Sequence, residues 1–209
     1  MLPARLQLAL IALAACAAAA VLGVLAASGH QNAGQPLSLT NGWAGALRPP
    51  GLDVPRFRLR DQDGRVVTSR SLRGGPVVYA FVYSTCRDTC PAEVQTIRGA
   101  LDDLGRDVPV IGVSVDPAND TPKRAIAFLL EQKMTGRMHF LLGRRAELEP
   151  VWKAFGIRPE SKRLEHSAHV VLADARGRQR IGFPFDELTE ERLAHDLARL
   201  AGSSRGYGA

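Results

Sequence analysis

Cys86 and Cys90 form a Cys-x-x-x-Cys pair directly after a long apolar run, residues 76–83. Such a run is typical of a strand that is buried on both faces of a sheet. Open α/β sheets place their sites at the carboxyl ends of these strands. Pro91 suits the first turn of a following helix, whose amino end favours a thiolate over a thiol. The pair therefore predicts soft-metal binding, thiol–disulfide exchange or both.

Two purely structural roles explain this pair less well. A disulfide between the cysteines would close a very short loop and remove little entropy from the unfolded chain. Burial as unpaired thiols conflicts with the polar residues around them, which are Ser84, Thr85, Arg87, Asp88 and Thr89. We therefore expect a functional pair that is not buried.

The elements around the cysteines alternate between strands and helices. The predicted strands are residues 56–60 and 65–68, on either side of a turn at Asp63-Gly64, and then 76–83, 109–115, 138–142, 169–174 and 179–183. The predicted helices are residues 91–105, 122–130, 147–155 and 189–200. This order indicates an α/β fold, a thioredoxin-like three-layer sandwich with a mixed central sheet.

A metal site needs a ligand besides the two sulfurs, and imidazole suits copper(I) or zinc. His166 and His169 precede and begin the strand expected beside the cysteine turn, whereas His139 and His195 lie in other elements and His30 precedes the domain. In thioredoxin-like proteins the turn before that strand faces the cysteines, which favours His166. His169 stays open as the alternative, because side chains alternate between the two faces of a strand.

Four segments together resemble the Sco/SenC family over about residues 52–201. They are Tyr83-Ser84-Thr85-Cys86-Arg87-Asp88-Thr89-Cys90-Pro91, Ser114-Val115-Asp116-Pro117-Ala118-Asn119-Asp120-Thr121-Pro122, Glu165-His166-Ser167 and Phe183-Pro184-Phe185. The resemblance implies a membrane-anchored thioredoxin-fold protein that binds copper through Cys86, Cys90 and His166. It further implies a role in assembling the copper centre of cytochrome c oxidase, with a copper-receiving oxidase subunit or another thiol protein as partner.

Some residues depart from the family pattern or have a structural explanation. Arg87 stands where the family usually has Pro, and Thr89 where an apolar residue is common. The charge of Arg87 is expected to lower the pKa of the thiols. Asp116 and Asp120 are interpreted as turn and helix-cap residues, with Thr121 as the other candidate for the cap and with a role of the aspartates close to the metal as the alternative.

Two functions remain open at this point. The first is a copper-binding assembly factor that delivers copper to the oxidase centre or reduces its cysteines. The second is a general thiol–disulfide oxidoreductase without an obligatory metal, in which Cys86 and Cys90 form the redox pair. The sequence thus favours a metallochaperone and leaves open whether the chain is also an enzyme. A peroxidase of the peroxiredoxin type would explain neither His166 nor the four-residue spacing of the cysteines.

The amino-terminal segment, residues 1–29, is interpreted as a signal anchor or signal peptide. Residues 8–27 carry no charge and would span a bilayer core as a helix. A retained single-pass anchor is favoured, with a cleaved signal peptide, which fits the small residues Ala26, Ala27 and Ser28, or lipidation at Cys16, as alternatives. Each places the remainder outside the cytoplasm: a flexible tether at residues 30–51, the domain at 52–202 and a tail at 203–209.

The net charge of +6 comes mostly from arginine, since only four lysines occur. Nucleic-acid binding would need a dense basic patch with interleaved aromatic residues, and the sequence has none. A basic surface close to anionic lipid headgroups is the better interpretation.

Overall fold

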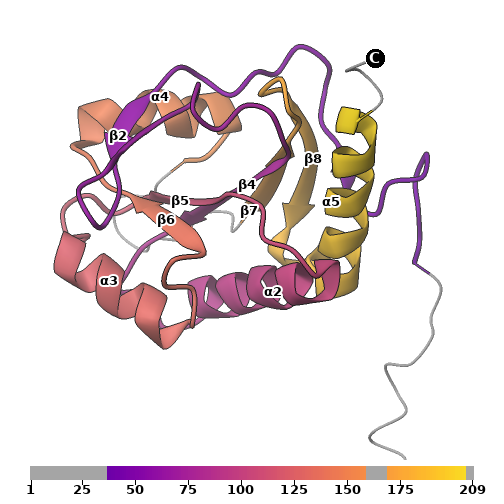
Figure 1. The fold of residues 1–209 in the computed structure, drawn as a ribbon. Helices are drawn as coiled ribbons and strands as arrows, with labels where there is room; N and C mark the ends of the chain where they lie inside the picture. Colours follow the sequence, from indigo (N-terminus) through magenta and orange to yellow (C-terminus); the bar gives the residue numbers. More distant parts are fainter. Residues whose placement is uncertain (1–36, 159–168, 206–209) are drawn as a thin grey trace, which may run out of the picture. The chain divides into compact units, whose positions relative to one another are not determined.

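The computed structural model describes residues 37–158 and 169–205, with side chains up to residue 202. Six strands form one mixed sheet in the order β1-β8-β7-β4-β5-β6 (Figure 1). The strands are β1 Ala46–Leu47, β4 Val77–Val82, β5 Val110–Ser114, β6 Met138–Leu141, β7 His169–Ala173 and β8 Gln179–Pro184. β4, β5 and β6 run parallel, and β7, β8 and β1 join antiparallel. The predicted mixed sheet is confirmed.

Helices cover both faces of the sheet and give the expected three layers. Side chains of α2 (Thr89–Leu104), α3 (Pro122–Glu131) and α5 (Glu190–Arg205) join one core cluster. The other cluster contains side chains of α4 (Arg145–Phe155) and of a separate hairpin, β2 (Arg58–Arg60) with β3 (Val66–Thr68). A short 3-10 helix, Phe185–Glu187, precedes α5. Figure 1 shows α2 and α4 on opposite sides of the central strands.

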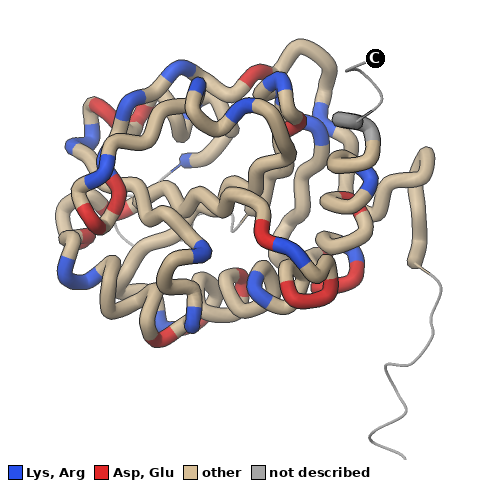
Figure 2. The backbone as a smooth tube through the Cα atoms, in the orientation of Figure 1, with Lys and Arg blue, Asp and Glu red and all other residues tan. Residues whose placement is uncertain are grey.

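β4 lies in the interior of the sheet, between β7 and β5. Its side chains alternate between the two clusters: Val78, Ala80 and Val82 face one, and Tyr79 and Phe81 face the other. All six residues of the strand are buried. β4 and β5 carry no charged residue, and the charged residues lie in the elements around them (Figure 2). The unbroken apolar run thus places the cysteine turn at the end of a strand with little freedom to move.

Helix ends follow the expected cap chemistry. α2 stops at Gly105, which has φ +66° and so adopts the left-handed conformation that glycine tolerates. Thr121, rather than Asp120, caps α3, because its side chain accepts a hydrogen bond from the N–H of Arg124 at 3.3 Å. The hydroxyl of Thr189 accepts from the N–H of Arg192 at 3.3 Å in the same way.

Part of the segment predicted as a flexible tether, residues 30–51, belongs to the folded domain. We call residues 44–48 the arm. The backbone N–H groups of Ala44 and Gly45 both donate to the buried carboxylate of Asp196 at 2.9 Å. β1 then pairs with β8, and the N–H of Arg48 donates to Arg180 O at 2.9 Å. The domain therefore starts before residue 52, because tertiary hydrogen bonds order a Gly-containing segment that has no helix or strand pattern.

The expected membrane helix, residues 8–27, lies outside the described residues. Among those that are described, no helix is long and apolar enough to cross a bilayer.

Candidate metal and thiol site

The cysteine turn connects β4 to α2 at the carboxyl end of the central strand. β4 ends at Val82, and the N–H of Cys86 donates to Tyr83 O at 3.2 Å, which closes the turn. Cys86 precedes α2, whereas Cys90 lies in its first turn. The prediction from the apolar run and from Pro91 therefore gives the correct position for both residues.

The sulfur of Cys86 satisfies the amino end of α2. The N–H of Cys90 donates to Cys86 Sγ at 3.3 Å. Asp88, at the usual cap position, makes no side-chain cap bond. A sulfur that accepts from a first-turn amide is stabilised as a thiolate by that bond and by the positive end of the helix. Cys86 thus has the surroundings of an ionised thiol.

Cys86 and Cys90 are not joined in a disulfide, and both are buried: Cys86 is 5% exposed and Cys90 is fully enclosed. The expectation from their polar neighbours is wrong on this point. Arg87 and Asp88 are themselves exposed, so their polarity says little about the sulfurs beside them.

The two thiols differ in pKa because they share a hydrogen bond. The pKa of Cys86 is lowered, first by its hydrogen bond with the Cys90 thiol and further by backbone N–H groups and by Tyr83. The pKa of Cys90 is raised by the same bond and by burial. The charge of Arg87 is not a main cause of the lowered pKa of Cys86. The low pKa that the sequence attributed to Arg87 comes from hydrogen bonds instead. These opposite shifts favour an ionised Cys86 next to a protonated Cys90.

Glu93 lies one helical turn after Cys90 on the buried side of α2. The residue is fully buried, and neither carboxylate oxygen has a hydrogen-bond partner among the described residues. Burial, and then the negative charge of Cys86, raise its pKa to about 8. A neutral carboxyl group at this position avoids a second negative charge beside the thiolate.

Three of the candidate histidines are engaged away from the cysteines. His139 Nδ1 lies 2.9 Å from Asp61 Oδ2, and His195 Nδ1 lies 2.8 Å from a carboxylate oxygen of Asp196. His169 Nε2 lies 3.3 Å from Arg48 Nη1 and accepts from it, because a guanidinium only donates. Within residues 37–158 and 169–205, no group of three His, Cys, Asp or Glu side chains could hold a metal. His166 lies outside the described residues.

Asp120 connects the cysteine turn to the neighbouring strand. Its Oδ1 accepts from the N–H of Ser84 at 2.7 Å and from Ser84 Oγ at 2.5 Å. Its Oδ2 accepts from Ser114 Oγ, at the end of β5, at 2.5 Å. Asp116 instead accepts from the side-chain amide of Asn119 at 2.9 Å, within its own turn. Asp116 is thus a turn residue as predicted, and of the two predicted cap candidates, Asp120 and Thr121, it is Thr121 that caps α3.

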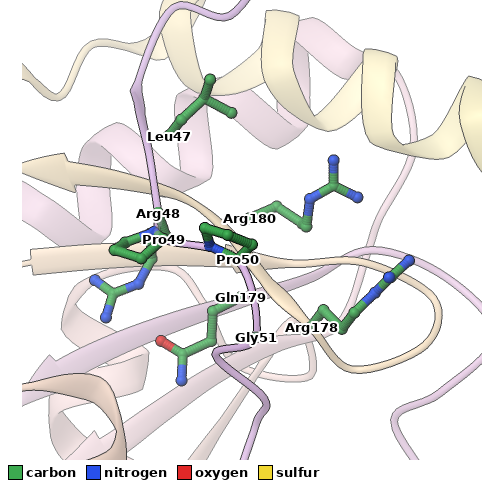
Figure 3. Close-up of a pocket in the computed structure, with 8 residues that line it drawn as sticks. All are labelled: Leu47, Arg48, Pro49, Pro50, Gly51, Arg178, Gln179 and Arg180. Carbon is green, nitrogen blue, oxygen red and sulfur yellow. The ribbon is translucent and has the colours of Figure 1, made fainter.

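The arm borders a pocket of about 660 Å³ beside β8 (Figure 3). The side chains of Arg48 and Gln179 extend to one side of the arm, and those of Arg178 and Arg180 to the other. Arg48 donates to Phe155 O at 3.2 Å and Gln179 to Ala154 O at 3.1 Å, both at the end of α4. The cationic groups do not converge on one point, so the pocket is a junction between elements rather than a ligand site.

Sequence reasoning missed Glu93 and the Arg48 junction, and it gave a role of Asp120 beside the site only as the alternative to a helix cap. Glu93 had a usable signal, because it shares the helical face of Val94, Ile97 and Leu101, where a buried residue is expected. The bonds of Asp120 and Arg48 join residues far apart in the chain, and no local pattern reports them.

Comparisons with known proteins agree with this architecture. A family model described as SCO1/SenC matches residues 47–202. The copper-bound structure of ScoI from Bradyrhizobium japonicum is 32% identical, covers 71% of this chain and 99% of its own, and superposes with a TM-score of 0.63. The structure of BsSco, a member of the Sco family of cytochrome c oxidase assembly proteins in which a disulfide switch was identified, is 25% identical. It covers 73% of this chain and 95% of its own, with a TM-score of 0.65.

Among curated sequences, the SCO1 protein homolog of Bacillus subtilis is 34% identical over 83 residues. That match covers 38% of this chain and 43% of the relative, so the alignment spans less than half of either protein.

Proposed function

The chain belongs to the SCO1/SenC family, and we propose that it is a membrane-tethered, extracytoplasmic protein that binds copper as cargo. It delivers this copper to, or reduces the cysteines of, the copper centre of cytochrome c oxidase during assembly. The observation that carries the proposal is the pair of adjacent thiols at the carboxyl end of the central strand, where the Cys86 sulfur accepts the Cys90 N–H and the pKa of Cys86 is lowered. The copper bound to ScoI at 32% identity supports the choice of metal.

We propose Cys86, Cys90 and His166 as the ligands. Two sulfurs and an imidazole are donors that copper(I) prefers. β7 starts at the cysteine end of β4, since Tyr79 pairs with Val171 and the strands are antiparallel. His166 precedes β7 by three residues, while His139, His169 and His195 are engaged elsewhere. A site with only three ligands leaves the ion open to exchange with a recipient protein.

Copper(I) titration of the full-length chain in detergent, with a competing chromophoric chelator, tests this ligand set. We expect one copper per reduced chain and a large loss of affinity in Cys86→Ser, Cys90→Ser and His166→Ala. His139→Gln is the matched control, because that imidazole contacts Asp61 rather than the cysteines. Wild-type affinity in His166→Ala would contradict the three-ligand site.

The second candidate is thiol–disulfide exchange without an obligatory metal, which the unequal pKa values of the two cysteines favour. The Cys86 thiolate would attack a target disulfide, forming a mixed disulfide and releasing one target thiolate. Cys90, after losing its proton, would displace the second target thiol, leaving a Cys86–Cys90 disulfide and a reduced target.

The two candidates differ in their need for the histidine. We expect His166→Ala to reduce a disulfide substrate at the wild-type rate while losing copper. A variant that lost both activities would show that the histidine is part of the thiol chemistry as well.

A further inference from the structure

The carboxylate of Asp120 is buried, with the residue 9% exposed, and makes three hydrogen bonds that serve no helix cap. Thr121 performs the capping of α3. Burying a carboxylate is costly unless it accepts hydrogen bonds, and Asp120 accepts three. We therefore look for its role in the groups that these bonds join. The identity of its partners indicates what that role is.

One side of the Asp120 bridge is firmly held. Ser114, which donates to Oδ2, ends β5, a strand paired on both edges with β4 and β6. The carbonyl of Ser114 also accepts from Trp152 Nε1 of α4 at 2.9 Å. The strand end is therefore fixed from the sheet and from the helix packed on it.

The other side of the bridge is the cysteine turn. Ser84 donates both its N–H and its hydroxyl to Oδ1, and it lies inside the turn that the bond from Cys86 to Tyr83 O closes. This turn presents Cys86 Sγ to the N–H of Cys90 at 3.3 Å. Loss of the bridge would release the segment that holds Cys86 while leaving Cys90 fixed in α2.

We propose that Asp120 is a positioning residue for Cys86. It ties the turn to the end of β5 and so keeps the Cys86 sulfur close to Cys90 for any reaction that needs both. The consequence for copper affinity rests on the proposed function, whereas the consequence for the thiol pair does not.

The test uses full-length protein in detergent and two readouts. Redox buffers of glutathione measure the effective concentration of the thiol pair, as two protein thiols and one glutathione disulfide give the Cys86–Cys90 disulfide and two glutathione thiols. Chelator competition measures copper(I) affinity. For Asp120→Asn, we expect both quantities to fall roughly tenfold, the usual scale for losing an outer partner of a ligand.

Thr121→Ala is the matched control, because it weakens the start of α3 without touching Ser84. We expect it to lower stability and leave both readouts at wild-type values. Ser84→Ala and Ser114→Ala each remove one hydroxyl from the bridge and should give smaller losses of both quantities. These two variants test the proposal even if Asp120→Asn does not fold.

The proposal is overturned if Asp120→Asn stays within twofold of wild type, if Thr121→Ala gives an equal loss, or if both serine variants change nothing. Absence of copper binding in the wild type would instead count against the proposed function, and the glutathione readout would still test Asp120.

Discussion

Replacing Glu93 by Gln should stabilise the protein at neutral pH and leave it almost unchanged in mild acid. The side chain is fully buried, and its carboxylate oxygens have no hydrogen-bond partner among the described residues. Its pKa is raised from 4.5 to about 8, so the folded state disfavours the charged form. Gln keeps the size and polarity of the carboxylic acid and cannot ionise.

The size of the effect follows from linkage between protonation and folding. A group with a raised folded-state pKa supports folding fully below its unfolded pKa, and the contribution is lost as pH rises through the folded pKa. Here the window is about pH 4.5 to 8. One pKa unit corresponds to about 1.4 kcal/mol, so the wild type should lose about 3 kcal/mol relative to Glu93→Gln between pH 5 and 7.5.

Urea unfolding of the reduced protein at several pH values, followed by tryptophan fluorescence, measures this difference. Glu131→Gln, on the exposed end of α3, is the charge-matched control and should follow the wild-type profile. Parallel profiles for the wild type and Glu93→Gln would refute the reasoning. That result would mean that other interactions offset the cost of the buried negative charge when Glu93 ionises.

Two further predictions concern the thiol and the arm. The rate at which Cys86 reacts with iodoacetamide should reach half its maximum well below pH 8.5, the usual pKa of a free thiol, because the pKa of Cys86 is lowered in the folded state. Mass spectrometry of the alkylated protein measures this rate. A midpoint near pH 8.5, the usual thiol value, would contradict the hydrogen-bond argument. Asp196→Ala should cost about 3 kcal/mol in urea unfolding, because the N–H groups of Ala44 and Gly45 lose their acceptor. Asp196→Asn keeps one acceptor oxygen and should cost less.

Local patterns predicted the parts of the fold that local chemistry determines. A short apolar run rich in β-branched and aromatic residues favours a strand covered on both sides, and β4 is one. Gly105 marks the end of α2 because the left-handed backbone there suits glycine. The order of such elements was sufficient to predict the mixed sheet and the location of Cys86 and Cys90 at the end of its central strand.

Features that depend on distant partners were beyond local reasoning. The arm carries no apolar pattern, and its order comes from Asp196, about 150 residues later. The cysteines are buried although their neighbours are polar, since the turn directs Arg87 and Asp88 outward. His166 lies outside the described residues, and its role stays a prediction.

The arm also determines how a mechanical load would pass through the domain. A pull from the preceding chain would first strain the bonds from Ala44 and Gly45 to Asp196, and then the pairs between β1 and β8. β8 and β7 lie between β1 at this edge and β4, the strand that leads into the cysteine turn. Arg48 reaches further inward, to His169, but it bears load only after the earlier bonds have opened. We therefore expect a pull on the preceding chain to break bonds at the edge of the sheet before it changes the spacing of the two sulfurs.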